Sequence, residues 1–346
     1  MGFLAVLFAL IIEQARPLAR GNWIHAAFRG WARWSGSSLD AGRIQHGWIA
    51  WSAAVLGPAL ATLLIHWLLW QVSVLLAFLW SVAILYITLG FRQFSHHFTD
   101  IRDALDDGDE AGARELLAQW RQVETSELPR SEIVRHVIEY SVLAAHRHVF
   151  GVLCWFSVLA ALGLGPAGAV LYRMSEFVAR YWVHKSRLPA AGEGASPALQ
   201  QVAVGLWGLI DYVPARLTSL GFAVVGSFED AIDAWRSYSL RFTATRTTGL
   251  GLHNDGLILA ATSGAVNVRL GNEMLKAASA PGLIHGALQV EGLTGGTMDA
   301  LQQAADLSPG RVPEMAHLRS IVGLVWRSVV LWMVLLALLT LARLLG

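Results

Sequence analysis

The chain has 346 residues, of which 55% are hydrophobic and only 15% charged, and its mean hydropathy is +0.48. Soluble domains carry about 25% charged residues, so this deficit, together with 15 tryptophans, indicates an integral membrane protein. The net charge of +1 gives no basic field that would favour a nucleic-acid partner. The single cysteine, Cys154, excludes an intrachain disulfide and a cysteine cluster for zinc, and we expect it to be a buried packing residue.

The first half of the chain predicts membrane helices followed by one hydrophilic insert. Met1–Ile12 is apolar but has no preceding basic region and no small-residue cleavage site, so we expect a retained first helix rather than a signal peptide. About 20 apolar residues span a bilayer, and Trp48–Trp67 and Val72–Gly90 have this length. They form a hairpin joined at Gln71, and the arginines on both flanks place those flanks in the cytoplasm. Residues 91–147 then form a cytoplasmic helical insert.

The second half of the chain predicts shorter apolar segments and one mixed region. The expected elements are a second hairpin of Val149–Gly163 and Pro166–Val183, a linker at Leu188–Pro197, a charged apolar segment at Val202–Val225, a mixed helical and loop region at 227–320, and a final span at Val322–Leu345. We therefore expect an all-α, polytopic helical bundle with about five or six membrane segments. Its surroundings are the lipid bilayer of a bacterial inner membrane.

Charged residues interrupt one of these apolar segments, around Asp211 and Arg216. Charges at membrane depth cost at least about 2.5–3.5 kcal/mol each, so they are normally paired or functional. One interpretation is an anion-binding arginine oriented by a nearby carboxylate, with a helix kink at Pro214. The other is a helix end at the membrane interface, where Arg216 reaches out to lipid headgroups.

The block from residue 254 to 271 is polar at its start, small and apolar in its middle, and ends near a cation. Asn254 and Asp255 could hold a ligand hydroxyl or a metal-bound phosphate, Gly256 would allow close approach, and Arg269 could clamp an anion. Alternatively, the polar residues cap a helix whose small residues pack against another helix.

Two further groups of polar residues have structural interpretations. Arg135 and Glu139 are four residues apart, as in a solvated ion pair on a helix. His146 and His148 flank Arg147, which would repel a metal cation, so we expect histidines at a surface or interface and no metal site.

Several of these stretches, taken in order, resemble motifs of the CobD/CbiB family of cobalamin-biosynthesis membrane proteins. Ala104–Arg114 is similar to its "ALxxGDxxxAR", Glu132–Arg135 with Glu139 to its "EIVRxxxES", Tyr172-Arg173 to the start of its "YRxxNTLDSM", Pro214–Thr218 to its "PARLT", and Asn254–Gly271 to its "NxGxxxxAxAGALxVRLG". The resemblance is spread over about 170 residues, so it does not depend on any one motif.

This resemblance implies an enzyme that joins adenosylcobyric acid to aminopropanol or its phosphate through an amide bond. It implies ATP and a divalent cation as cofactors if that activity is retained, and a corrinoid or phosphate-bearing ligand. The ligand-binding pocket would lie at the cytoplasmic end of the helices. Its residues would be Glu139, Tyr172, Arg173, Asp211, Arg216, Asn254, Asp255, Gly256 and Arg269.

The chain also departs from the family's motifs, mainly where they carry carboxylates and amides. The family's "NTLDSM" corresponds here to Glu176–Tyr181, and the acidic pair before "PARLT" corresponds to Trp207 and Gly208. The chain is therefore either a divergent synthase or a catalytically degenerate relative that still binds a ligand. An alternative is a non-catalytic signalling or scaffold protein of the AmpE kind, whose "DWVPxRL" is similar to Asp211–Leu217. Such a protein would bind a membrane protein partner or form a homo-oligomer.

Overall fold

The computed structural model describes residues 2–16, 23–121, 128–186, 195–244, 250–271 and 310–345. Within these ranges the chain is helical, with one isolated parallel β-bridge between Val268 and Arg311. The all-α prediction is confirmed. The chain divides into two compact units: unit 1 comprises residues 1–96, 144–214 and 329–346, and unit 2 comprises residues 97–143 and 215–328.

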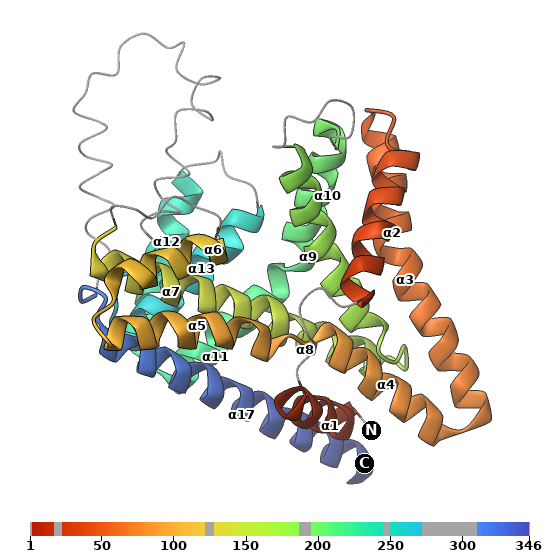
Figure 1. Cartoon of the computed structure of the whole chain (residues 1–346). Coiled ribbons are helices and arrows are strands. Elements are labelled where there is room, and N and C mark those ends of the chain that lie inside the picture. The colour runs from red at the N-terminus through yellow and green to blue at the C-terminus, as the bar shows by residue number, and fades with distance from the viewer. Residues whose placement is uncertain are drawn as a thin grey trace. The chain divides into compact units, whose positions relative to one another are not determined.

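Unit 1 contains the N-terminal helices and the middle of the chain (Figure 1). Its helices are α1 (Gly2–Ala15), α2 (Trp23–Leu39), α3 (Ile44–Val72), α4 (Val74–Thr88), the π-helical turn η1 (His146–Phe150), α8 (Gly151–Ala161), α9 (Ala167–Ser186) and α10 (Pro197–Ile210). Helix α9 packs against α3, α8 and α10, while α1 packs against α4. The centre of this unit is therefore α9, which carries two of the predicted site residues, Tyr172 and Arg173.

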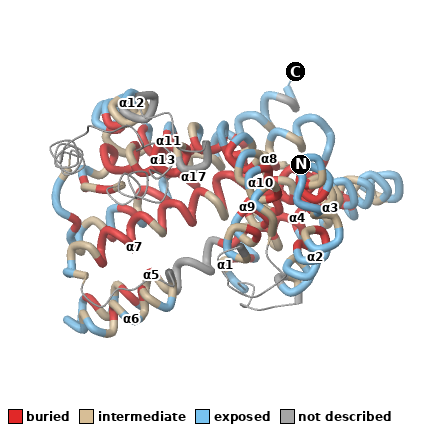
Figure 2. The backbone as a smooth tube through the Cα atoms, turned by 90° about the horizontal axis from the view of Figure 1, so that it is seen from above, coloured by how far each residue is buried: buried red, intermediate tan, exposed pale blue. Residues whose placement is uncertain are grey.

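The predicted hairpin is present, but its turn lies at Ser73 rather than at Gln71. The Ser73 N–H donates to the carbonyl of Leu69, and the Ser73 hydroxyl accepts from the N–H of Leu75 at 3.2 Å. One serine thus ends α3 and caps α4, because a serine hydroxyl can satisfy an N–H group left without a partner at a helix start. The end of α3 near this turn is largely exposed (Figure 2), as expected for a surface that faces lipid.

Unit 2 contains the predicted insert and most of the motif-bearing chain. Its helices are α5 (Phe91–Asp106), α6 (Glu110–Arg121), α7 (Arg130–Ala145), α11 (Tyr212–Val225), α12 (Phe228–Ala244), α13 (Leu250–Val266) and the first part of α17 (Met315–Leu345). Helices α12 and α13 pack closely along their length, because Gly264 has no side chain to separate them. A Cβ atom at Gly264 would lie 2.2 Å from the carbonyl oxygen of Asp230.

Three described helices are long and apolar enough to cross a membrane, and a bent pair would make a fourth. The three are Ile44–Val72, Arg130–Ala161 and Met315–Ala342; the pair is α10 with α11, bent by 43°. The expectation of five or six spans is thus too high for the described residues. Helix α4 has only 15 residues, and α9, predicted as half of a hairpin, carries charged residues and does not qualify. The chain is nevertheless a helical membrane protein by its apolar helices.

Two predicted boundaries differ from the structure. The helix that begins at Arg130 does not stop at the end of the 91–147 insert but continues to Ala161, so the predicted span at Val149–Gly163 is its second half. The reason is that the polar residues at 146–148 interrupt the apolar pattern without breaking the helix. Residues 272–309 of the mixed 227–320 region, and most of the predicted linker at 188–197, lie outside the described residues.

Candidate ligand-binding site

Asp211 is at the centre of a buried hydrogen-bonded network in unit 1. The Tyr172 hydroxyl donates to Asp211 Oδ1 at 2.8 Å, and His146 Nε2 lies 2.8 Å from the same oxygen. The hydroxyl of Tyr172 is also 3.3 Å from His146 Nε2, and all three residues are fully buried. Burial and the neighbouring Asp211 raise the pKa of Tyr172, so the tyrosine stays neutral and donates. The predicted carboxylate is therefore held inside unit 1 by two partners.

The π-helical turn η1 allows Tyr172 to meet two residues that a regular helix would separate. The N–H of Gly151 donates to the carbonyl of His146, five residues earlier. In an α-helix, residues five apart point about 140° away from one another, whereas the wider turn brings them onto one face. Tyr172 contacts His146 there and also covers Gly151, where a Cβ atom would lie 2.0 Å from the tyrosine ring.

Asp211 also marks the break between α10 and α11. It follows the last residue of α10, and α11 begins at the next residue with Pro214 in its first turn. The indole N–H of Trp155 donates to the carbonyl of Ile210 at 3.0 Å, which satisfies one of the carbonyls exposed at the end of α10. The ring of Trp207 packs 5.1 Å from that of Tyr172. Asp211 and its neighbours thus stabilise a broken helix.

Arg173, the next residue after Tyr172, belongs to a different group of side chains. Its Nη1 donates to Glu176 Oε2 at 2.6 Å, and Arg180 Nη1 donates to Glu176 Oε1 at 2.9 Å. Sequence reasoning noticed Glu176 only as a departure from a family motif. The i, i+3 and i+4 spacing of these three residues was the available signal.

Arg216 and Asn254 meet in unit 2. Arg216 Nη1 lies 3.4 Å from Asn254 Oδ1, and Asn254 is fully buried. Asn254 is the fifth residue of α13 and therefore lies inside the helix. The alternative in which it caps a helix start is wrong, because α13 begins at Leu250, one turn earlier than the polar residues suggested.

Residues next to Asn254 pack against α12. The ring of His253 stacks on Tyr238 at 5.7 Å, and a Cβ atom at Gly256 would lie 2.0 Å from the Tyr238 hydroxyl. The space over Gly256 is thus taken by a tyrosine of the same unit. Burial and Arg216 lower the pKa of His253, while burial and Asp255 raise the pKa of Tyr238.

Arg269 follows the C-terminal end of α13. Asn267 adopts a left-handed conformation with φ of 52°, and the N–H of Val268 donates back to the carbonyl of Ser263. The N–H of Arg269 then donates to the carbonyl of Arg311 at 2.9 Å. The side-chain Nε of Arg269 is buried and has no hydrogen-bond partner among the described residues. Ser263 is nine residues after Asn254, about 13 Å along the helix axis. Arg216 and Arg269 therefore lie toward opposite ends of α13.

Glu139 connects the insert to the segment after Arg269. Glu139 Oε1 accepts the N–H of Gly271 at 2.8 Å and lies 3.8 Å from Arg135 Nη1, while Glu139 Oε2 lies 3.9 Å from His136 Nδ1. Arg135 is 3% exposed and Glu139 is 6% exposed. The expectation of a solvated ion pair is wrong, because both side chains are buried and Glu139 also accepts the N–H of a residue 132 positions later in the sequence.

The predicted residues thus fall into two groups, one in each unit. Tyr172, Arg173 and Asp211 belong to unit 1; Glu139, Arg216, Asn254, Asp255, Gly256 and Arg269 belong to unit 2. Sequence reasoning missed His146, which it assigned to a surface or interface and which is fully buried. Among the described residues, no three histidine, cysteine, aspartate or glutamate side chains gather as a metal site would require.

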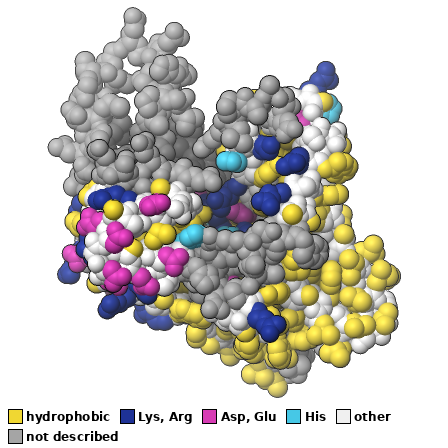
Figure 3. All heavy atoms as spheres, in the orientation of Figure 1, with side chains coloured by type: hydrophobic (Ala, Val, Ile, Leu, Met, Phe, Trp, Pro, Cys, Tyr) yellow, Lys and Arg dark blue, Asp and Glu magenta, His cyan; other side chains and the backbone are white. Residues whose placement is uncertain are grey.

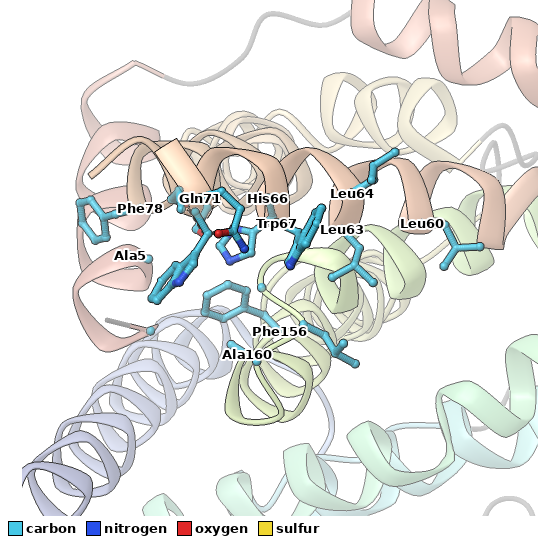
Figure 4. Close-up of a pocket in the computed structure, with 17 residues that line it drawn as sticks. Ala5, Leu60, Leu63, Leu64, His66, Trp67, Gln71, Phe78, Phe156 and Ala160 are labelled. Carbon is cyan, nitrogen blue, oxygen red and sulfur yellow. Dashed lines mark hydrogen bonds between the residues drawn. The ribbon is translucent and has the colours of Figure 1, made fainter. Parts of the chain in front are cut away.

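A cavity of about 930 Å³ lies elsewhere in unit 1 (Figure 4). Its walls come from α1, α3, α4 and α8 and are mostly apolar, with His66 and Gln71 among the few polar groups. None of the predicted site residues lines it. We therefore place the candidate site not in this cavity but among the polar residues of unit 2.

The chain is similar to proteins of one family over most of its length. The family model described as CobD/Cbib protein matches residues 3–281. The chain is 27% identical over 353 aligned positions to "Cobalamin biosynthesis protein CobD" of Stutzerimonas stutzeri, with 96% of each chain covered. It is 30% identical over 197 positions to the protein of the same name in Chromobacterium violaceum, with 57% of each chain covered. No solved structure matches significantly. The resemblance found in the motifs is confirmed, and the AmpE alternative gains no support.

Proposed function

Because this chain belongs to the CobD/CbiB family and takes part in cobalamin biosynthesis, we propose that it forms the amide bond between adenosylcobyric acid and aminopropanol phosphate. The family resemblance implies this reaction, and the relatives are named for the same pathway. In the same proposal, the chain is a multi-pass protein of the bacterial inner membrane.

The observation that supports this proposal is the contact between Arg216 and Asn254. They belong to two family motifs that are separated by 38 positions in sequence, and the fold brings their side chains to 3.4 Å. Asn254 is completely buried, while Arg216 is half-buried. A buried amide that contacts a partly exposed guanidinium is the arrangement expected where a protein orients an arginine toward a ligand.

A second contact of the same kind lies toward the other end of α13. Glu139, from the "EIVR" motif, accepts the backbone N–H of Gly271, the last residue of the "VRLG" motif. This contact fixes the short segment that carries Arg269. Burying a carboxylate costs free energy unless the carboxylate is paired and hydrogen-bonded. We therefore propose that Glu139 is buried because it holds the segment of Arg269 in place.

The two arginines suit the charges of the proposed substrates. In the amide-forming step, the amine nitrogen attacks the activated carboxyl carbon of adenosylcobyric acid. The C–N bond forms, the C–O bond to the activating phosphoryl or nucleotidyl group breaks, and the amine loses a proton. A guanidinium near the carboxyl carbon would stabilise the developing oxyanion, and a second one would bind the phosphate of aminopropanol phosphate.

The family reaction uses ATP and a divalent cation, which would activate the carboxyl group. The described residues do not fit a protein-built metal centre, because they contain no three-ligand cluster. In this proposal the chain's own residues bind the substrates and stabilise charge. A homo-oligomer or a membrane protein partner remains a prediction from the sequence.

Complementation tests this function. The gene is supplied to a bacterial strain that lacks the synthase, and growth that depends on corrinoid synthesis is measured at matched membrane expression. We expect the wild-type chain to restore growth and Arg216→Ala to fail. The control is Arg102→Gln, which removes a partly exposed arginine of unit 2 that pairs with Asp103. This variant should grow as the wild type does.

A binding measurement separates the two parts of the proposal. Purified protein in detergent is titrated with adenosylcobyric acid, and binding is followed by equilibrium dialysis. Binding without growth would overturn amide formation but keep the binding site. Loss of both in well-expressed wild-type protein would overturn the proposed function.

A further inference from the structure

The cavity of unit 1 lies among helices that carry none of the residues assigned above to substrate binding. Its volume of about 930 Å³ is within the range of pockets that hold small molecules, about 300–1,000 Å³. Figure 4 shows Phe156 and Ala160 of α8 opposite Leu63 of α3, with Ala5 of α1 at one side. Ala5 and Phe156 are buried, so they belong to the inner wall. The cavity is therefore large enough for an occupant of its own.

The lining of the cavity carries no formal charge at neutral pH apart from what a histidine could add. No Lys, Arg, Asp or Glu is among the described residues that line it. The polar side chains include His66, Gln71 and Ser81, and the Ser81 hydroxyl already donates to the carbonyl of Ala77 at 2.9 Å. Burying a charge without a partner is costly. The part of an occupant that lies inside the cavity should therefore be uncharged and mostly apolar.

The mouth of the cavity lies on the lipid-facing surface of α3. Leu60, Leu64 and Trp67 line the cavity and are also exposed, with exposed fractions of 61%, 56% and 56%. Helix α3 is long and apolar enough to cross a membrane, and Figure 3 shows hydrophobic side chains gathered around the end of the α3–α4 hairpin. A molecule of the bilayer can thus enter from the side without passing through water.

The length and polarity of the cavity match one lipid chain. Its lining residues on α3 run from Leu60 to Gln71, a stretch of about 16 Å at 1.5 Å a residue. One leaflet supplies half of the hydrocarbon core, about 15 Å. Gln71 and Trp70 lie at the end near the turn at Ser73, and tryptophan favours the level of the lipid headgroups. The Leu60 end is apolar and would lie near the middle of the bilayer.

We propose that this cavity holds one acyl chain of a phospholipid from the leaflet at the α3–α4 turn. The ester carbonyl of the lipid lies at Gln71, and the methyl end of its chain lies at Leu60. The chain supplies the van der Waals contacts that an empty apolar cavity would lack. Because no charged side chain lines the cavity, phosphatidylcholine and phosphatidylglycerol should occupy it equally. The site does not depend on the reaction proposed above.

Photochemical labelling in nanodiscs tests the site. The nanodiscs contain phosphatidylcholine with a diazirine on its acyl chain, and mass spectrometry locates the labelled residues after irradiation. We expect label on Phe156, which is 2% exposed and can be reached only from the cavity. Ala160→Trp fills part of the cavity and should lower the labelling of Phe156 by about tenfold. Ala161→Trp is the matched control, because Ala161 follows directly and does not line the cavity.

Label confined to residues such as Leu68, which is exposed on α3 but does not line the cavity, would overturn the proposal. Equal labelling of Phe156 in wild type and folded Ala160→Trp would also overturn it. Should Ala160→Trp fail to fold, Leu64→Asn at the mouth decides the question, with Leu68→Asn as its control. Both positions are exposed, and only Leu64→Asn should reduce the labelling of Phe156. Equal labelling with phosphatidylglycerol would support recognition of the chain rather than the headgroup, and a strong preference for either lipid would contradict it.

Discussion

The polar residues of the two units have different structural roles, although they look alike in the sequence. In unit 1, Asp211 is fully buried and is contacted by Tyr172 and His146, so that its network is closed to water. In unit 2, Asn254 is equally buried but contacts a half-exposed arginine, Arg216. In the first arrangement the carboxylate is enclosed, with two partners on Oδ1 and none on Oδ2 among the described residues, whereas in the second the guanidinium is only partly buried.

The comparison shows that burial of a polar residue does not by itself identify a binding site. Buried polar groups need hydrogen-bond partners wherever they are. What distinguishes the candidate site is a partly buried guanidinium that contacts a fully buried amide. Substitutions in the two units test this difference and the packing on which unit 2 depends.

Removing the closed network should cost the most stability. Asp211→Ala leaves the Tyr172 hydroxyl and His146 buried without their carboxylate partner, so we expect a loss of about 3 kcal/mol or more. Thermal unfolding in detergent measures this loss. Asp211→Asn keeps one acceptor oxygen and is the matched control, with a smaller expected loss. Equal midpoints for wild type and Asp211→Ala would show that the network contributes little.

The close approach of α12 and α13 should be the next most sensitive feature. Gly264→Ala would place a Cβ atom 2.2 Å from the carbonyl oxygen of Asp230 in α12. This clash can be relieved only by moving the two helices apart, so we expect the free energy of unfolding to fall by about 2–3 kcal/mol. Gly221→Ala, in α11 of the same unit, is the control. No atom lies within 4 Å of its Cβ position, so alanine there should stabilise the helix by about 0.5–1 kcal/mol. Comparable thermal midpoints for the two variants would contradict the close packing.

Truncating the half-exposed arginine should weaken ligand binding and leave stability nearly unchanged. We expect Arg216→Ala to weaken the binding of adenosylcobyric acid by about tenfold to a hundredfold, as removal of a charged hydrogen bond does. Equilibrium dialysis measures the affinity, and the unfolding midpoint serves as the control. If Arg216→Ala unfolds the protein as Asp211→Ala does, the two units have the same kind of polar network after all.

The smallest effect is expected in the pH dependence of unit 2. The pKa of His253 is lowered by burial and by Arg216, so the unfolded chain takes up a proton more readily than the folded one. Stability should therefore be full above the ordinary histidine pKa of about 6.5 and should fall as the pH drops through the lower folded value. His253→Gln should flatten this dependence in unfolding curves recorded from pH 7 to pH 5. Arg216→Gln should raise the pKa of His253, and no change in either variant would contradict the coupling.

Sequence reasoning was most successful where local patterns decide the structure. Hydropathy predicted the α3 hairpin and the final helix, and the family motifs predicted residues that the fold does bring together, such as Arg216 and Asn254. The turn at Ser73 could also have been predicted from the sequence, since serine is a favoured residue at the start of a helix.

The failures came where burial depends on residues distant in sequence. His146 follows no apolar pattern, and its burial depends on Tyr172 and Asp211, which come 26 and 65 residues later. The sequence around Glu139 predicts half of a surface ion pair, and its contact with the N–H of Gly271, 132 residues later, is seen only in the fold. Periodicity along a single helix cannot report such contacts, because it describes only the helix itself.

The π-helical turn at His146–Phe150 makes this part of the chain sensitive to length as much as to chemistry. Such a turn accommodates one more residue than a regular one. Deleting a single residue from it would restore ordinary winding and rotate every later position by about 100° relative to those before it. Gly151 would then no longer lie against Tyr172, and a residue with a side chain would face the tyrosine ring instead. A one-residue deletion here should thus be more damaging than most substitutions.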